Sequence, residues 1–109
     1  MINNTFRIHT ESAVGGLGNF EVKHLFDKTP DNLETVAIVT VEPGECIGYH
    51  IHDCDNELYY ILCGKAEYDD NGSVSVIGEG TSTCTLVGEG HSIKNIGTDT
   101  LRFVAVIVK

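Results

Sequence analysis

Two histidines and one glutamate have the residue types and the spacing of a metal site. His50 and His52 are two residues apart. On a β-strand their side chains would therefore point to the same face, with Cα atoms about 6–7 Å apart. Two imidazoles placed in this way could bind one ion through bonds of about 2 Å. Glu57 follows a run of turn-forming residues at 53–56. We therefore expect a strand, a turn and a second strand that returns Glu57 to the same ion.

The composition is that of a globular chain with an acidic surface. The chain has 109 residues, of which 41% are hydrophobic, and 7 basic against 16 acidic residues give a net charge of −9. This length suits one domain with one core, so we expect a single domain over residues 1–109. Nucleic acids and anionic membrane surfaces both bind clusters of Lys and Arg, so the excess of acidic residues argues against either as a partner.

The sequence carries no sign of export or of a membrane span. No apolar run approaches the roughly 18–20 residues that a span requires, and residues 1–10 lack the basic and apolar segments of a signal peptide. We therefore expect a cytoplasmic protein with reduced thiols. The thiols are those of Cys46, Cys54, Cys63 and Cys84.

Short alternating segments separated by glycine turns predict an all-β sandwich or barrel, because no segment keeps helical spacing over three turns. Asn71-Gly72 predicts a tight hairpin. The glycine-rich segment 13–19 predicts a loop without the spacing of a dinucleotide site, and residues 27–34 predict a loop with one helical turn. Outside the histidine region, we expect strands at 5–10, 20–26, 35–41, 58–63, 65–68, 73–77, 81–87, 91–96 and 101–108.

Two motifs make the chain resemble the cupin superfamily. The first motif is Gly, five residues, His-x-His, three or four residues, Glu, six residues, Gly. It is matched by Gly44, His50, His52, Glu57 and Gly64, within residues 44–64. The second motif is Gly, five residues, Pro-x-Gly, two residues, His, three residues, Asn. It is matched within residues 80–95 by Gly80, Gly88, His91 and Asn95.

One position departs from the second motif. Leu86 stands where the family usually has proline, so we expect a looser turn before His91. The four motif glycines are expected to serve backbone turns. We also expect Asn95 to be a structural hydrogen-bonding residue, and His9 and His24 to be ordinary half-exposed histidines.

The resemblance implies a cupin-type double-stranded β-helix, or jelly-roll barrel, with one divalent metal. The implied ligands are His50, His52, Glu57 and His91. Four protein ligands would leave two of six octahedral positions open, which suits Mn, Fe, Ni or Co. Zinc usually takes fewer ligands and is less expected. A tetrahedral zinc site of His50, His52 and Cys54 is an alternative, and a structural zinc would predict that chelation unfolds the protein.

Small single-domain metal cupins include dioxygenases, oxalate-decarboxylase-like enzymes, sugar isomerases and lyases. The resemblance thus implies a metalloenzyme that acts on a small oxygen-rich metabolite, such as an organic acid or a sugar derivative. The alternative is a non-catalytic small-molecule-binding or sensor cupin.

Tyr59 lies two residues after Glu57, so both should face the cavity. Tyr59 is the candidate catalytic residue, either as a substrate contact or as a proton shuttle. A packing role would explain its inward position equally well.

The resemblance also implies a homodimer, because small cupins commonly dimerise. The segment Ile2–Thr10 is a plausible strand to add to the sheet edge of a neighbour.

In the last strand, residues 103, 105 and 107 form one face and residues 104, 106 and 108 the other. The sequence does not say which of these faces looks into the cavity.

Overall fold

The computed structural model describes residues 1–12, 15 and 17–109. Residues 13, 14 and 16, which belong to the predicted glycine-rich loop, lie outside this part of the chain. Within the described residues, no helix is long and apolar enough to cross a membrane.

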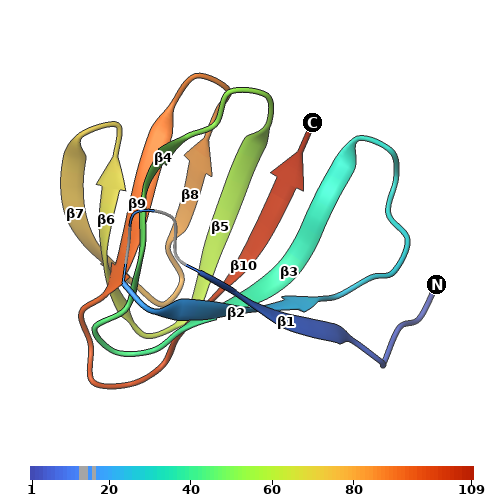
Figure 1. Ribbon diagram of the computed structural model, residues 1–109, viewed down its shortest axis with the longest axis horizontal. Helices are drawn as coiled ribbons and strands as arrows, with labels where there is room; N and C mark the ends of the chain where they lie inside the picture. The colour runs from blue at the N-terminus through green and yellow to red at the C-terminus, as the bar shows by residue number, and fades with distance from the viewer. Residues whose placement is uncertain (13–14, 16) are drawn as a thin grey trace.

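In the described part of the chain, ten β-strands form two antiparallel sheets, which confirms the all-β prediction (Figure 1). The larger sheet has six strands in the order β1-β2-β3-β10-β5-β8, and the smaller sheet has four in the order β4-β9-β6-β7. The strands are β1 (Arg7–Ser12), β2 (Asn19–His24), β3 (Leu33–Val41), β4 (Cys46–Ile51), β5 (Asn56–Cys63), β6 (Lys65–Asp70), β7 (Ser73–Gly78), β8 (Ser82–Thr85), β9 (Gly90–Asn95) and β10 (Leu101–Val108).

Local turn chemistry explains where several strands end. Asn71 and Gly72 have φ angles of 53° and 91°, the positive values of a tight hairpin turn, so the predicted hairpin between β6 and β7 is confirmed. Gly64, with φ of 102°, ends β5 at a place where a Cβ would lie 2.8 Å from the Leu101 Cα. Glycine is therefore required there by both conformation and space.

The helical turn predicted within residues 27–34 is wrong. The Leu33 N–H donates to the Pro30 carbonyl at 2.9 Å, which closes a single tight turn. β3 begins at Leu33 itself, so the chain becomes extended before a helical i+4 hydrogen bond can form.

The core lies between the two sheets, where alternate residues of each strand point inward. Phe103 stands opposite Val39 on one side and opposite Ile61 on the other. All three side chains are buried, and Phe103 is completely inaccessible. This register answers the question that the sequence left open: Phe103, Ala105 and Ile107 form the inner face of β10. Val104, Val106 and Val108 therefore form its outer face.

Replacing Phe103 by alanine should destabilise the fold strongly. The substitution removes a fully buried ring from the middle of the core and should lower the free energy of unfolding by about 3–5 kcal/mol. Chemical denaturation followed by circular dichroism would measure this loss. The control is Val76→Ala on the exposed side of β7, which should change the free energy by less than about 0.5 kcal/mol. Equal effects of the two substitutions would contradict the placement of Phe103.

Candidate metal centre

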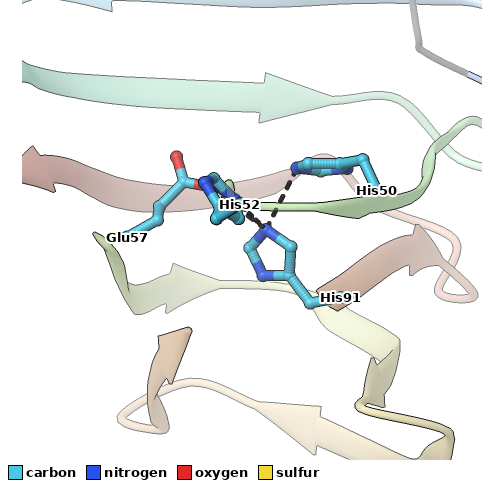
Figure 2. Close-up of side chains that lie close together, drawn as sticks. All are labelled: His50, His52, Glu57 and His91. Atoms are coloured by element: carbon cyan, nitrogen blue, oxygen red, sulfur yellow. Dashed lines mark hydrogen bonds and ion pairs between the residues drawn. The ribbon is translucent and has the colours of Figure 1, made fainter. Parts of the chain in front are cut away.

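Four side chains from three strands and one turn converge between the sheets (Figure 2). His50 lies near the end of β4, and His52 follows directly after that strand. Glu57 lies on β5 and His91 on β9. His50 stands opposite His91 in the antiparallel pair of β4 and β9. One ligand atom from each of the four residues lies within 4.8 Å of the others. The structure thus brings together all four residues that the two motifs predict as metal ligands.

The separations of the donor atoms suit a single ion. The Nε2 atom of His91 lies 3.0 Å from that of His52 and 3.2 Å from that of His50. The Oε1 atom of Glu57 lies 3.1 Å from the His91 Nε2 and 3.2 Å from the His52 Nε2. Neighbouring donors on an octahedral ion with bonds of about 2.1–2.2 Å are about 3.0–3.1 Å apart. The cluster therefore has the dimensions of a coordination sphere.

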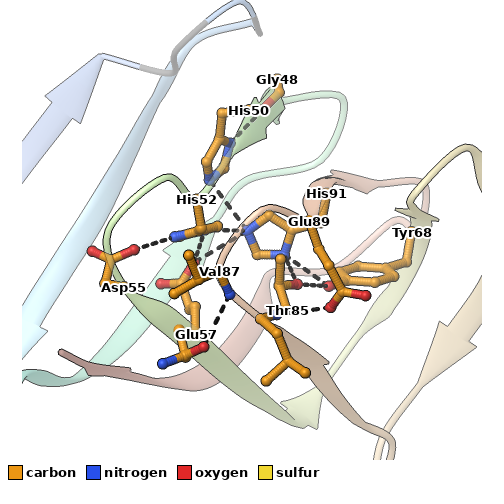
Figure 3. A network of polar contacts seen from close by, with 12 residues as sticks. Gly48, His50, His52, Asp55, Glu57, Tyr68, Thr85, Val87, Glu89 and His91 are labelled. Carbon is orange, nitrogen blue, oxygen red and sulfur yellow. Dashed lines mark hydrogen bonds and ion pairs between the residues drawn. The ribbon is translucent and has the colours of Figure 1, made fainter.

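Hydrogen bonds on the outer side of two rings fix how these imidazoles point (Figure 3). The His50 Nδ1 lies 2.8 Å from the Gly48 carbonyl oxygen, and the His52 Nδ1 lies 2.6 Å from the Asp55 carboxylate. Carbonyl and ionised carboxylate oxygens only accept hydrogen bonds, so each Nδ1 carries the hydrogen and donates it. In the neutral rings, the Nε2 lone pairs are then directed into the cluster.

The third imidazole is held by two hydroxyl groups. The Nδ1 of His91 lies 2.7 Å from the Tyr68 hydroxyl and 2.9 Å from the Thr85 hydroxyl. A hydroxyl can accept from an Nδ1–H group, which again leaves the Nε2 lone pair for the cluster. His91 is only 1% exposed, so these contacts set the orientation of a ring that has no access to water.

A cation accounts for this arrangement of donors. Three imidazole nitrogens and a carboxylate oxygen, whose nearest pairs lie 3.0–3.2 Å apart, would repel one another if only lone pairs faced inward. Burial lowers the pKa of His50, and the neighbouring histidines lower it further, so this imidazole is neutral and able to bind a metal at neutral pH. The donor set therefore fits a divalent metal of the kind that accepts mixed nitrogen and oxygen ligands.

The zinc alternative that uses Cys54 does not match this geometry. Cys54 is exposed, and among the described residues the group able to hold a metal contains Glu57 in place of the thiol. β4 ends at Ile51, so the strand alternation that would align Cys54 with the two histidines stops before it.

Three of the four candidate ligands, His50, His52 and Glu57, line a cavity of about 340 Å³, near the small end of the roughly 300–1,000 Å³ of small-molecule sites. Apolar side chains form much of its wall, including Val39, Ile47 and Ala105. A ligand at the cluster would thus be surrounded largely by apolar surface.

Tyr59 faces this cavity, as its spacing from Glu57 predicts. Its ring stacks on the His91 ring with centroids 5.1 Å apart, and it also packs against Phe103 at 4.3 Å. Burial raises the pKa of Tyr59 well above its usual value of 10, and the negative charge of Glu57 raises it further. The hydroxyl is therefore protonated, and able to donate a hydrogen bond, throughout the neutral pH range.

Two histidines outside the motifs belong to the same cavity. His9 on β1 and His24 on β2 line it, and their rings stack with centroids 4.9 Å apart. The prediction that they are ordinary half-exposed histidines misses this position. The Nε2 of His24 is buried and has no hydrogen-bond partner among the described residues.

Three residues that hydrogen-bond to the histidine rings were not predicted from the sequence: Asp55, Tyr68 and Thr85. Asp55 lies within the first motif, three residues after His52, where a turn can bring the two side chains together. Tyr68 and Thr85 reach His91 from β6 and β8, across 23 and 6 residues of chain. Tyr68 reaches that ring because β6 pairs with β9, whereas Thr85 reaches it because the two sheets pack face to face.

The turn before His91 is closed despite the missing proline. The Leu86 N–H donates to the Glu89 carboxylate at 2.8 Å, and the Glu89 N–H donates to the Leu86 carbonyl at 2.9 Å. Proline could not make the first bond, because it has no N–H. The looser turn expected at this position is therefore wrong.

Asn95 has the structural role predicted for it, since its buried side-chain amide donates to the carbonyls of Val41 and Asp99.

Comparison with known proteins places the chain in one family. A model of the cupin domain matches residues 37–107. Over 96 residues the chain is 38% identical to an oxalate-binding protein of Thermotoga maritima, covering 86% of this chain and 79% of that protein. The crystal structure of a predicted oxalate decarboxylase from Thermotoga maritima has a TM-score of 0.89 and 36% identity, covering 94% of this chain and 92% of the other.

The cupin domain of Cnp3 from Schizosaccharomyces pombe is also similar in fold, with a TM-score of 0.76 at 21% identity, covering 83% of this chain and 61% of the other. The two sheets thus form the double-stranded β-helix that the motifs imply. The chain belongs to the cupin family.

Proposed function

We propose that the protein is a metal-dependent cupin enzyme that acts on a small organic acid, with oxalate as the first candidate substrate. The observation that carries this proposal is the convergence of three histidine Nε2 atoms and one glutamate oxygen beside a cavity that His50, His52 and Glu57 line. The relatives described as an oxalate-binding protein and as a predicted oxalate decarboxylase support the choice of acid.

In this proposal His50, His52, Glu57 and His91 hold one divalent ion, preferably Mn, Fe, Ni or Co. The ion would supply a Lewis-acid centre with free positions for a chelating carboxylate. Glu57 contributes one negative charge, so the site remains attractive to an anionic ligand. Asp55 accepts the His52 Nδ1–H, which orients that ring and makes it a better ligand.

Tyr59 is proposed to border the bound acid. Its position on the cavity wall beside His91 allows its protonated hydroxyl to donate to a carboxylate oxygen. Apolar side chains beside it, such as Val39 and Ala105, lower the local dielectric constant, which strengthens such a hydrogen bond. The ring also packs against His91, so Tyr59 combines the contact and packing roles that the sequence left open.

The second candidate function is binding without turnover, as in a sensor or carrier. The description of one relative as an oxalate-binding protein favours it. The same four ligands would serve both functions, so only the fate of the acid separates them.

We also propose that the chain works as a homodimer. β1 lies at the edge of the six-stranded sheet and pairs with β2. All six of its side chains are exposed in the isolated chain.

His91→Ala should abolish metal binding. Loss of a partner that merely orients a ligand typically lowers metal affinity about 10–100-fold, and loss of a direct ligand should cost at least as much. Elemental analysis of untagged protein should find close to one Mn, Fe, Ni or Co per wild-type chain and less than about a tenth of that in the variant. His9→Ala, which removes a histidine outside the cluster, should retain the metal. Equal metal content in both variants would refute the assignment of His91.

Metal-loaded protein supplied with ¹³C-oxalate should release formate and CO₂. The oxalate monoanion splits at its C–C bond, and its proton ends on the carbon of formate, so no other reactant is consumed. Carbon NMR would follow both products, with metal-stripped protein as the control. Saturable binding by calorimetry without products would replace the enzyme proposal with the binding alternative. If the experiments detect neither binding nor products, oxalate is not the ligand of this site.

Tyr59→Phe should weaken oxalate binding while leaving the metal in place. Loss of one hydrogen bond to a charged group corresponds to about 1.5–3 kcal/mol, or roughly 10–150-fold in the dissociation constant. Calorimetry would measure the change, and elemental analysis would confirm the metal. Tyr60→Phe removes the same hydroxyl from the opposite face of β5 and should have no effect. An unchanged dissociation constant in Tyr59→Phe would limit Tyr59 to packing.

A further inference from the structure

A row of inward-facing residues crosses the larger sheet from the metal cluster to His24. Tyr59, whose ring stacks on His91, stands opposite Ala105 on β10. Ala105 stands opposite Ala37 on β3, which in turn stands opposite His24 on β2. Partners in antiparallel strands share one face of a sheet, and three strand spacings of about 4.8 Å place β5 and β2 about 14 Å apart. Tyr59, Ala105 and His24 all line the cavity, which therefore spans the sheet from the cluster to His24.

His24 carries a hydrogen-bonding atom that its own chain does not use. Its Nε2 is buried and has no hydrogen-bond partner among the described residues, although the side chain lines the cavity. Buried polar atoms in folded proteins are nearly always paired, because an unpaired one costs free energy. The ring is held in place by stacking on His9, with centroids 4.9 Å apart. A ligand in the cavity would supply the missing partner.

The charges around His24 favour a neutral group at this end of the cavity. Glu11 and Glu34 line the cavity, and none of the described lining residues is Lys or Arg. Burial lowers the pKa of His24, and Arg7 and His9 lower it further, so the imidazole is neutral at neutral pH. A carboxylate here would meet two like charges without a cationic partner. A hydroxyl group can instead accept from an imidazole N–H and donate to a carboxylate.

The size of the cavity calls for a ligand longer than oxalate. A volume of about 340 Å³ has room for about eleven groups of the size of a water molecule, at about 30 Å³ each. An oxalate ion chelated at the metal centre has only two carbons, so it would leave much of this volume empty. It would also stop short of His24, which lies on the third strand from Glu57 and Tyr59.

We propose that His24 forms a second ligand subsite, across the cavity from the metal centre, and that the acid which fills the cavity is a hydroxylated monocarboxylic acid longer than oxalate. This inference rests on the metal-dependent function proposed above and names the class of acid. The carboxylate and its neighbouring oxygen would chelate the ion, while a hydroxyl group at the far end pairs with the His24 Nε2. His24 determines specificity in this account and takes no part in a chemical step.

Protein loaded with Mn(II) should bind D-gluconate more tightly than glycolate. Both acids carry a carboxylate beside a hydroxyl group and can chelate the ion, but only gluconate extends across the cavity. One added hydrogen bond corresponds to roughly a 2–12-fold lower dissociation constant, which calorimetry would measure. D-Glucarate, with a carboxylate at each end, should bind more weakly than gluconate. Equal affinities for gluconate and glycolate would overturn the subsite, and glucarate binding at least as tightly as gluconate would overturn the neutral far end.

Variants of His24 assign the preference to its side chain. His24→Phe keeps an aromatic ring but removes both nitrogens, so it should lose the preference for gluconate and bind glycolate as before. His24→Gln places an amide nitrogen near the position of Nε2 and should keep most of the preference. Thr40→Val, on the outer face of the same sheet opposite Arg102, is the control and should bind both acids like wild type. Circular dichroism and metal content should be unchanged in all three variants.

The outcomes separate this subsite from the proposed function. A full preference for gluconate in His24→Phe would overturn the role of His24. Wild-type protein that binds oxalate or glycolate without preferring gluconate would overturn the subsite and leave the proposed function standing. Wild-type protein that takes up the metal but binds none of the acids would overturn the proposed function, and the subsite with it.

Discussion

The register of β4 against β9 is the constraint on which the site depends. It sets His50 opposite His91, and the pairing is shifted between Ile47 and His50. The hydrogen bonds outside the rings then fix their orientation, since each Nδ1 has a partner and each Nε2 faces the cluster. Glu57 arrives from the opposite sheet, so the site exists only when both sheets are correctly packed. The core around Phe103 therefore supports the chemistry as well as the stability of the protein.

Much of the fold could be predicted from the sequence because most strands alternate clearly and several are followed by a glycine turn. The four candidate ligands were predictable for a similar reason, since two local motifs carry them. A loop was predicted at residues 27–34, but its expected helical turn is absent because β3 begins early, at Leu33, where it pairs with β10. Tertiary pairing of this kind leaves no local signal.

The surroundings of the site were much harder to predict. Tyr68 and Thr85 contact His91 from other strands, and nothing in their local sequence marks them as partners of that ring. His9 and His24 lie outside both motifs but reach the cavity because β1 and β2 extend the larger sheet over it. Residues that depend on how distant strands meet are therefore the ones that motif reasoning overlooks, and they are also those that shape the ligand cavity.

The central claim is that three imidazoles and one carboxylate are held ready for a divalent ion. A crystal structure of protein grown with Mn(II), with anomalous diffraction recorded on both sides of the manganese absorption edge, tests it most directly. The account predicts one manganese peak bonded to the Nε2 atoms of His50, His52 and His91 and to a carboxylate oxygen of Glu57. A well-ordered site without a manganese peak, in which protonated histidines donate hydrogen bonds to Glu57 instead, would contradict it.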